Sequence, residues 1–140
     1  MNHTLNRAKE LLMADAFTCV ILKGEHLYTS KSRGVKPLLD WYDDETDLKN
    51  GYAADKVVGK AAAYLYVLLE IRAVYTCVIS KPAYEVFKKY NIEVYYDVLV
   101  DAIENRKKTG YCPMETAVMD INTPEHALVA IKDRLKKASI

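Results

Sequence analysis

The spacing of apolar residues divides the start of the chain into a helix and two short strands. Over residues 4–15, four apolar side chains recur at helical spacing, namely Leu5, Ala8, Leu11 and Leu12. Thr4 is suited to cap this helix. Residues 16–23 are largely apolar and β-branched, 23–25 supply a turn, and 26–29 return as a second strand. The pattern predicts a packing helix followed by a β-hairpin.

The middle of the chain has the pattern of a long buried helix followed by a strand. Between residues 53 and 69, two neighbouring apolar stripes run at helical spacing, which is typical of a helix buried on more than one side. Residues 74–79 are apolar without alternation, as in a central strand of a parallel sheet. Ser80 is expected to cap the next helix, with Pro82 in its first turn.

The last third of the chain predicts one more strand and three more helices. Residues 92–96 form the strand, and Asp97 caps a helix over 97–106 that Gly110 terminates, with Lys107 and Lys108 suiting its negative end. A short helix follows over 113–119, and the final helix opens at 123–125.

This order of elements predicts an α/β fold. We expect a three-layer α/β/α sandwich with a mixed sheet and an N-terminal hairpin, formed by one domain spanning residues 1–140. In open sheets of this kind, ligands bind outside the carboxyl ends of the strands, against the helices that follow.

The composition of the chain disfavours several classes of protein, among them nucleic-acid-binding, membrane-spanning and zinc-binding proteins. The chain has 20 Lys and Arg against 19 Asp and Glu, so its net charge of +1 disfavours a dedicated nucleic-acid binder. No apolar stretch approaches the roughly 20 residues of a membrane span. The three cysteines and three histidines show no zinc spacing, so we expect reduced thiols, no metal and no cofactor. Without a secretory pattern, we expect a cytoplasmic protein.

A first candidate site lies at the start of the helix predicted from residue 53. Lys56 and Lys60 stand four residues apart, where like charges repel on a helix, and Gly59 disfavours helix formation. An anion at the helix start would relieve the repulsion, with Gly59 allowing close approach. The alternative is structural: Asp55 complements the helix dipole and the lysines are solvated.

A second candidate site lies at the start of the short helix near residue 113. Cys112 at an N-cap, with lysines nearby, is a candidate nucleophile, and Glu115 is placed to carry a proton. The same two residues also have capping-box spacing, in which Glu115 accepts from the Cys112 amide.

Three segments carry a resemblance to a known family. They are Gly-Val-Lys-Pro-Leu-Leu at 34–39, Ala-Asp-Lys-Val-Val-Gly-Lys-Ala-Ala-Ala at 54–63 and Gly-Tyr-Cys-Pro-Met-Glu at 110–115. Together they resemble the prokaryotic family named domain of unknown function 1893, across nearly the whole chain. The resemblance implies a cytidine deaminase-like fold and no particular activity.

The zinc ligands of active deaminases are missing from this chain. Those enzymes use His-x-Glu and Pro-Cys-x-x-Cys at two helix starts. The first motif would fall at residues 53–57, where no His occurs, and the second at 82–86, where both thiols are absent. Zinc-dependent deamination is therefore not expected.

The leading hypothesis is a metal-free domain that binds a nucleotide-like or other anionic small molecule in the cleft between two helix starts. Asp55 would accept from a hydroxyl or amine, and Lys56 or Lys60 would meet the anion near Gly59. Ser80 and Lys81 would line the opposite wall.

Two alternatives remain open. One is an enzyme with Cys112 as nucleophile and Glu115 or Asp55 as acid or base. The other is a protein-interaction module that uses the acidic run 43–47 or exposed tyrosines, and self-association is also left open.

Overall fold

The computed structural model describes residues 1–104 and 110–138 of the 140-residue chain. The helices of the described part are α1 (His3–Ala14), α2 (Lys36–Asp43), α3 (Lys60–Leu68), α4 (Lys81–Lys89), α5 (Pro113–Val118) and α6 (Pro124–Ala138). The strands are β1 (Cys19–Lys23), β2 (His26–Ser30), β3 (Tyr52–Val58), β4 (Ala73–Ser80) and β5 (Glu93–Val100).

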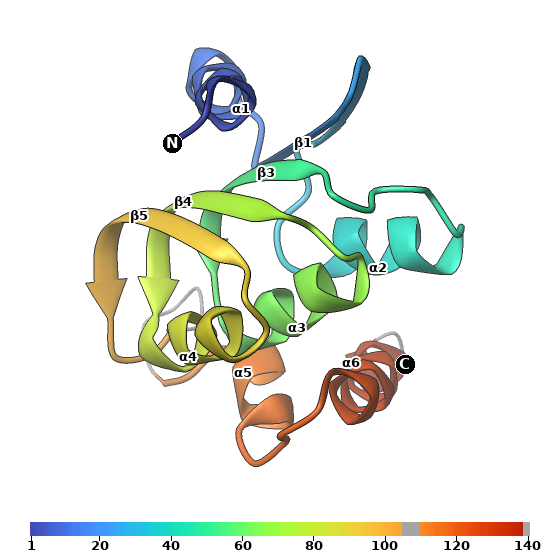
Figure 1. The fold of residues 1–140 in the computed structure, drawn as a ribbon. Coiled ribbons are helices and arrows are strands. Elements are labelled where there is room, and N and C mark those ends of the chain that lie inside the picture. The colour runs from blue at the N-terminus through green and yellow to red at the C-terminus, as the bar shows by residue number, and fades with distance from the viewer. Residues whose placement is uncertain (105–109, 139–140) are drawn as a thin grey trace.

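The strands form one mixed sheet in the order β2-β1-β3-β4-β5. Strand β1 is antiparallel to both β2 and β3, whereas β3, β4 and β5 are parallel to one another. Helix α1 covers one face, and α2, α3 and α4 lie on the other, with α5 and α6 packed outside α3 (Figure 1). The predicted α/β/α sandwich with an N-terminal hairpin is therefore confirmed.

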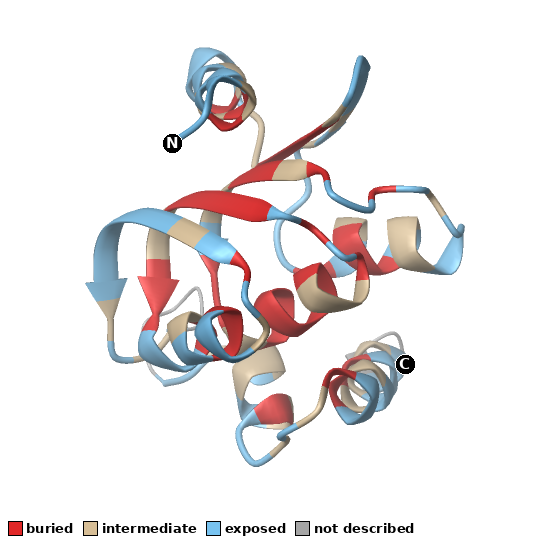
Figure 2. Ribbon diagram, viewed as in Figure 1, coloured by how far each residue is buried: buried red, intermediate tan, exposed pale blue. Residues whose placement is uncertain are grey.

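Burial follows these layers. Helix α3 is buried along most of its length between the sheet and the outer helices, whereas β5, at the edge of the sheet, is exposed (Figure 2). A second, smaller apolar cluster joins α1 to the opposite face of the sheet through Leu5, Leu12 and Tyr75.

The helix predicted over residues 53–69 is wrong in its first third. Residues Tyr52–Val58 form strand β3, and the helix begins only at Lys60. The buried Ala53 and Ala54 of β3 are adjacent, and α3 is buried on most sides, so neither element shows the period that would distinguish a strand from a helix. Lys56 and Lys60 therefore do not share a helix face, and Asp55 does not complement the α3 dipole.

The helix predicted over residues 97–106 is also wrong where the structure describes it. Residues 97–100 continue strand β5, and 101–104 are not helical. The Asp97 carboxylate accepts a hydrogen bond from the Tyr75 hydroxyl on the neighbouring strand instead of capping a helix. Arg106, Lys107 and Lys108 lie outside the described residues.

Candidate functional site

Helices α3 and α4 begin side by side at the carboxyl ends of the parallel strands. Val58 pairs with Ile79 in the register of β3 and β4, and each strand leads into its helix within two residues. Ser80 caps α4, because its hydroxyl accepts from the Ala83 amide at 3.2 Å. This is the predicted arrangement of two helix starts at one edge of the sheet.

The amino end of α3 is occupied by a side chain from α5. Gly59 is the N-cap of α3 and offers no side-chain cap. The Glu115 carboxylate fills this role: Oε1 accepts from the Lys60 amide at 2.6 Å, and Oε2 accepts from the Ala61 amide at 3.0 Å. A carboxylate is therefore bound where the sequence predicts an anion.

Gly59 makes this contact sterically possible. A Cβ at this position would lie 2.3 Å from Oε1, 2.4 Å from Cδ and 2.6 Å from Oε2 of Glu115. The Gly59 backbone, at φ −100° and ψ −177°, is open to other residues. The position therefore requires glycine for the approach of the carboxylate and not for its backbone conformation.

Burial and nearby charges have opposite effects on the pKa values of Glu115 and Lys60. Burial raises the pKa of Glu115, and the two amides and the Lys60 charge counteract the rise. Burial likewise lowers the pKa of Lys60, against the attraction of Glu115 and Asp120. The Lys60 ammonium donates to the Met119 carbonyl at 3.0 Å, so both ends of α5 are tied to the start of α3.

Asp55 belongs to a separate hydrogen-bonded chain between the sheet and α3. The Tyr66 hydroxyl donates to Asp55 Oδ2 at 2.6 Å, and Cys19 Sγ lies 3.3 Å from the same hydroxyl. Burial raises the pKa of Asp55 to about 6, although the Tyr66 hydrogen bond opposes the rise. Burial also raises the pKa of Tyr66 and that of Cys19.

The sequence analysis did not single out Tyr66 or Cys19. Cys19 is buried, and its Sγ lies against the Tyr66 hydroxyl. One signal for Tyr66 was available, because a tyrosine inside an otherwise apolar buried helix needs a partner for its hydroxyl.

The other predicted residues have local partners. The Lys56 ammonium approaches Met13 Sδ at 3.7 Å, and Lys81 forms an exposed ion pair with Asp101 at 2.8 Å. Cys112 is the N-cap of α5 without a side-chain cap, and its amide donates to the Ile103 carbonyl. The capping box predicted between Cys112 and Glu115 is therefore wrong, because Glu115 caps α3.

The family model for a domain of unknown function (DUF1893) matches residues 7–135. The chain belongs to the DUF1893 family. A solved structure of a DUF1893 family protein (TM1506) from Thermotoga maritima is 26% identical in sequence to this chain, with a TM-score of 0.86. The match covers 98% of this chain and 91% of that one. No curated protein matches the chain.

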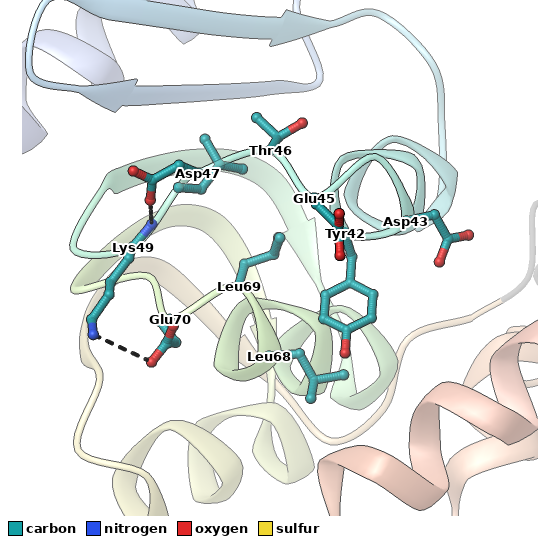
Figure 3. A pocket seen from close by; sticks show the side chains of 10 residues that line it. Tyr42, Asp43, Glu45, Thr46, Asp47, Lys49, Leu68, Leu69 and Glu70 are labelled. Carbon is teal, nitrogen blue, oxygen red and sulfur yellow. Dashed lines mark hydrogen bonds and ion pairs between the residues drawn. The ribbon is translucent and has the colours of Figure 1, made fainter.

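Two surface cavities of this DUF1893 chain lie away from the start of α3. One, of about 380 Å³, is bordered by the acidic run after α2 and by the end of α3 (Figure 3). Three of its four acidic side chains have cationic partners: Asp43 meets Lys132 at 2.9 Å, Asp47 meets Lys23 at 3.3 Å, and Glu70 lies 3.9 Å from Lys49. The other, of about 520 Å³, lies between α5 and α6.

Neither a metal centre nor a membrane span emerges from the part of this DUF1893 chain that the structure describes. Within residues 1–104 and 110–138, no three His, Cys, Asp or Glu side chains gather into a metal-binding group. No helix in the same residues is long and apolar enough to cross a membrane.

Proposed function

We propose that this DUF1893 domain binds an anionic, nucleotide-like small molecule at the amino end of α3. In this proposal, a phosphate or carboxylate group of the ligand replaces the Glu115 carboxylate on the Lys60 and Ala61 amides. The observation that carries the proposal is the hydrogen bonding of Glu115 to both amides, from a residue 55 positions away in sequence. Glu115 is then an internal competitor of the ligand.

The energetics of Glu115 support an exchange of this kind. A buried carboxylate has a desolvation cost, which the raised pKa of Glu115 reflects. A phosphate group offers more acceptor oxygens and more charge to the same amides and to the helix dipole. Helix α5, which carries Glu115, has only six residues, so its displacement disrupts little regular structure.

We assign the surrounding residues the roles that the sequence predicts. Lys60 would contact the anion after leaving the Met119 carbonyl, and Ser80 and Lys81 stand at the neighbouring helix start. Asp55 would accept from a hydroxyl or amine of the ligand through Oδ1, whose contact to the Val57 amide is long, at 3.4 Å.

We also propose that the architecture is cytidine deaminase-like. The mixed sheet, its N-terminal hairpin and the paired starts of α3 and α4 support this relationship. Pro82 in the first turn of α4 is a further supporting feature. Superposition of a crystal structure of this chain on a zinc deaminase tests the proposal, and a different strand order in the two sheets would refute it.

Isothermal titration calorimetry tests ligand binding most simply. The probes are inorganic phosphate, AMP and CMP, titrated into wild type, Glu115→Ala and the exposed control Glu125→Ala. Removal of the internal competitor should strengthen binding at least about tenfold in Glu115→Ala and leave Glu125→Ala like wild type. Glu115→Gln provides a milder variant if Glu115→Ala does not fold. Absence of binding to every folded variant would refute the proposal.

A second candidate is an enzyme that uses Cys112 as nucleophile. It is favoured by the pKa of Asp55, about 6, which suits an acid or base near neutral pH. Thiol alkylation followed by peptide mass spectrometry across a pH series tests it. Reaction of Cys112 with an ordinary thiol profile, near pH 8.5, would contradict the enzyme hypothesis.

A further inference from the structure

A groove between α5 and α6 has the features of a second ligand site. Its volume of about 520 Å³ falls within the range of roughly 300–1,000 Å³ that small-molecule pockets occupy. The residues of α6 that line it are spaced at i, i+3, i+4 and i+7, so they share one helix face: Ala130, Asp133, Arg134 and Lys137. Residues 113, 116 and 117 of α5 form the other wall.

The groove is open because its facing positions carry small side chains. Ala117 on α5 and Ala130 on α6 both line it and are both partly exposed. The fully buried Val118 of α5 and the fully buried Ala127 and Ile131 of α6 belong to the main hydrophobic core and do not line the groove. Larger residues at the two alanines would fill the space.

Two cations in the groove have no carboxylate partner. Within residues 1–104 and 110–138, neither Arg134 nor Lys137 takes part in an ion pair, although Lys132 on the same helix pairs with Asp43 at 2.9 Å. Arg134 is half-buried at the wall of the groove. A guanidinium presents a planar fork of donors that fits phosphate oxygens.

An aromatic ring completes the lining. Tyr111 is 57% exposed, which is among the highest values for the large apolar side chains. Exposed aromatic rings stack on planar ligands, and Tyr111 has no ring partner within the described residues.

We propose that this groove binds a nucleoside monophosphate. Arg134 and Lys137 would hold the phosphate, Asp133 would accept from a ribose hydroxyl, and the base would stack on Tyr111. The site is separate from the amino end of α3, because Glu115 projects from α5 toward α3 and does not line the groove.

Calorimetric titration of the full chain with AMP, GMP, CMP and UMP tests this proposal. The variants are Arg134→Ala, Ala130→Leu, which fills the groove without changing charge, and the matched control Lys136→Ala. Lys136 is an exposed cation on the same helix that does not line the groove. Lys137→Ala, at an exposed position, repeats the test if Arg134→Ala loses its fold.

We expect saturable binding of at least one nucleotide to wild type. Arg134→Ala and Ala130→Leu should each weaken it at least about tenfold, while Lys136→Ala leaves the groove affinity within about twofold. Equal losses of affinity in Arg134→Ala and Lys136→Ala would indicate nonspecific electrostatic attraction of the nucleotide to the helix and would overturn the proposal. Absence of saturable binding of all four nucleotides to wild type would overturn it as well.

Discussion

Replacement of Gly59 by alanine isolates the contribution of the Glu115 contact to stability. The added Cβ would lie 2.3–2.6 Å from three atoms of the Glu115 carboxyl group, closer than real Cβ contacts occur. The backbone at Gly59 has a negative φ of −100°, so alanine is not strained there. The substitution therefore acts by expelling Glu115 from the Lys60 and Ala61 amides.

The magnitude follows from two opposing effects. Loss of the charged hydrogen bonds to the helix start costs about 1.5–3 kcal/mol, and we expect about 2 kcal/mol for Glu115→Ala. Gly59→Ala loses the same bonds but gains about 0.4–1 kcal/mol from the reduced entropy of the unfolded chain. Gly59→Ala alone should therefore destabilise the protein by about 1–2 kcal/mol.

The double variant reverses the sign of this effect. Once Glu115→Ala has removed the carboxylate, Gly59→Ala should stabilise the protein by about 0.4–1 kcal/mol. Urea unfolding followed by circular dichroism measures all four members of the cycle. Gly110→Ala is the matched control, because a Cβ there meets no atom within 4 Å. If Gly59→Ala destabilises both backgrounds equally, Glu115 is not the reason for this glycine.

Three further predictions concern titration and helix ends. Burial raises the pKa of Asp55 from 3.8 to about 6, so the folded chain binds this proton more tightly than the unfolded chain. Its contribution to stability is present below pH 3.8 and is lost, by up to about 3 kcal/mol, as the pH rises to about 6. Urea midpoints across this range should flatten in Asp55→Asn, and an unchanged slope would contradict the assignment. Ser80→Ala should cost about 1 kcal/mol through loss of the α4 cap, measured by thermal unfolding, and no loss would argue against that cap. Glu70 follows α3 at φ 59°, so Glu70→Gly should stabilise the chain by about 0.5–1 kcal/mol in the same assay, whereas destabilisation would refute the strain.

The sequence predicts best the elements that have a marked boundary or one exposed face. The hairpin has a turn glycine, Gly24, with a positive φ of 57°, and α4 has both its cap at Ser80 and a proline in its first turn. Helix α6 alternates buried and exposed positions at helical spacing, and Ile131 is fully buried. In each of these elements, the local conformational preference of the residues and the tertiary packing favour the same structure.

Strand β3 cannot be distinguished in the sequence because its apolar positions lead into the buried helix α3 without a change of spacing. Val57 continues, by coincidence, the helical spacing of Ala61 and Leu65, so the stripe crosses the junction without a break. Gly59 was the available signal. It disfavours a helix interior, and the structure shows it as the N-cap, at the boundary itself.

The contact between Glu115 and the start of α3 cannot be predicted from local sequence patterns. The spacing of Cys112 and Glu115 satisfies a capping box within α5, and nothing local distinguishes that from capping another helix. The choice is made by tertiary packing, which places α5 against the start of α3 across 55 residues of chain. The sequence therefore predicts an anion near Gly59 but does not identify Glu115 as the group that caps α3.

The amide resonances of Lys60 and Ala61 report most directly on whether the start of α3 is an anion site that Glu115 occupies. The measurement is a titration of ¹⁵N-labelled Glu115→Ala with inorganic phosphate, followed by two-dimensional NMR, with wild type in parallel. We predict that these two amides show the largest, saturable shifts in the variant and require far more phosphate in wild type. If they do not respond in a folded variant, while other amides shift, the account of this site is wrong.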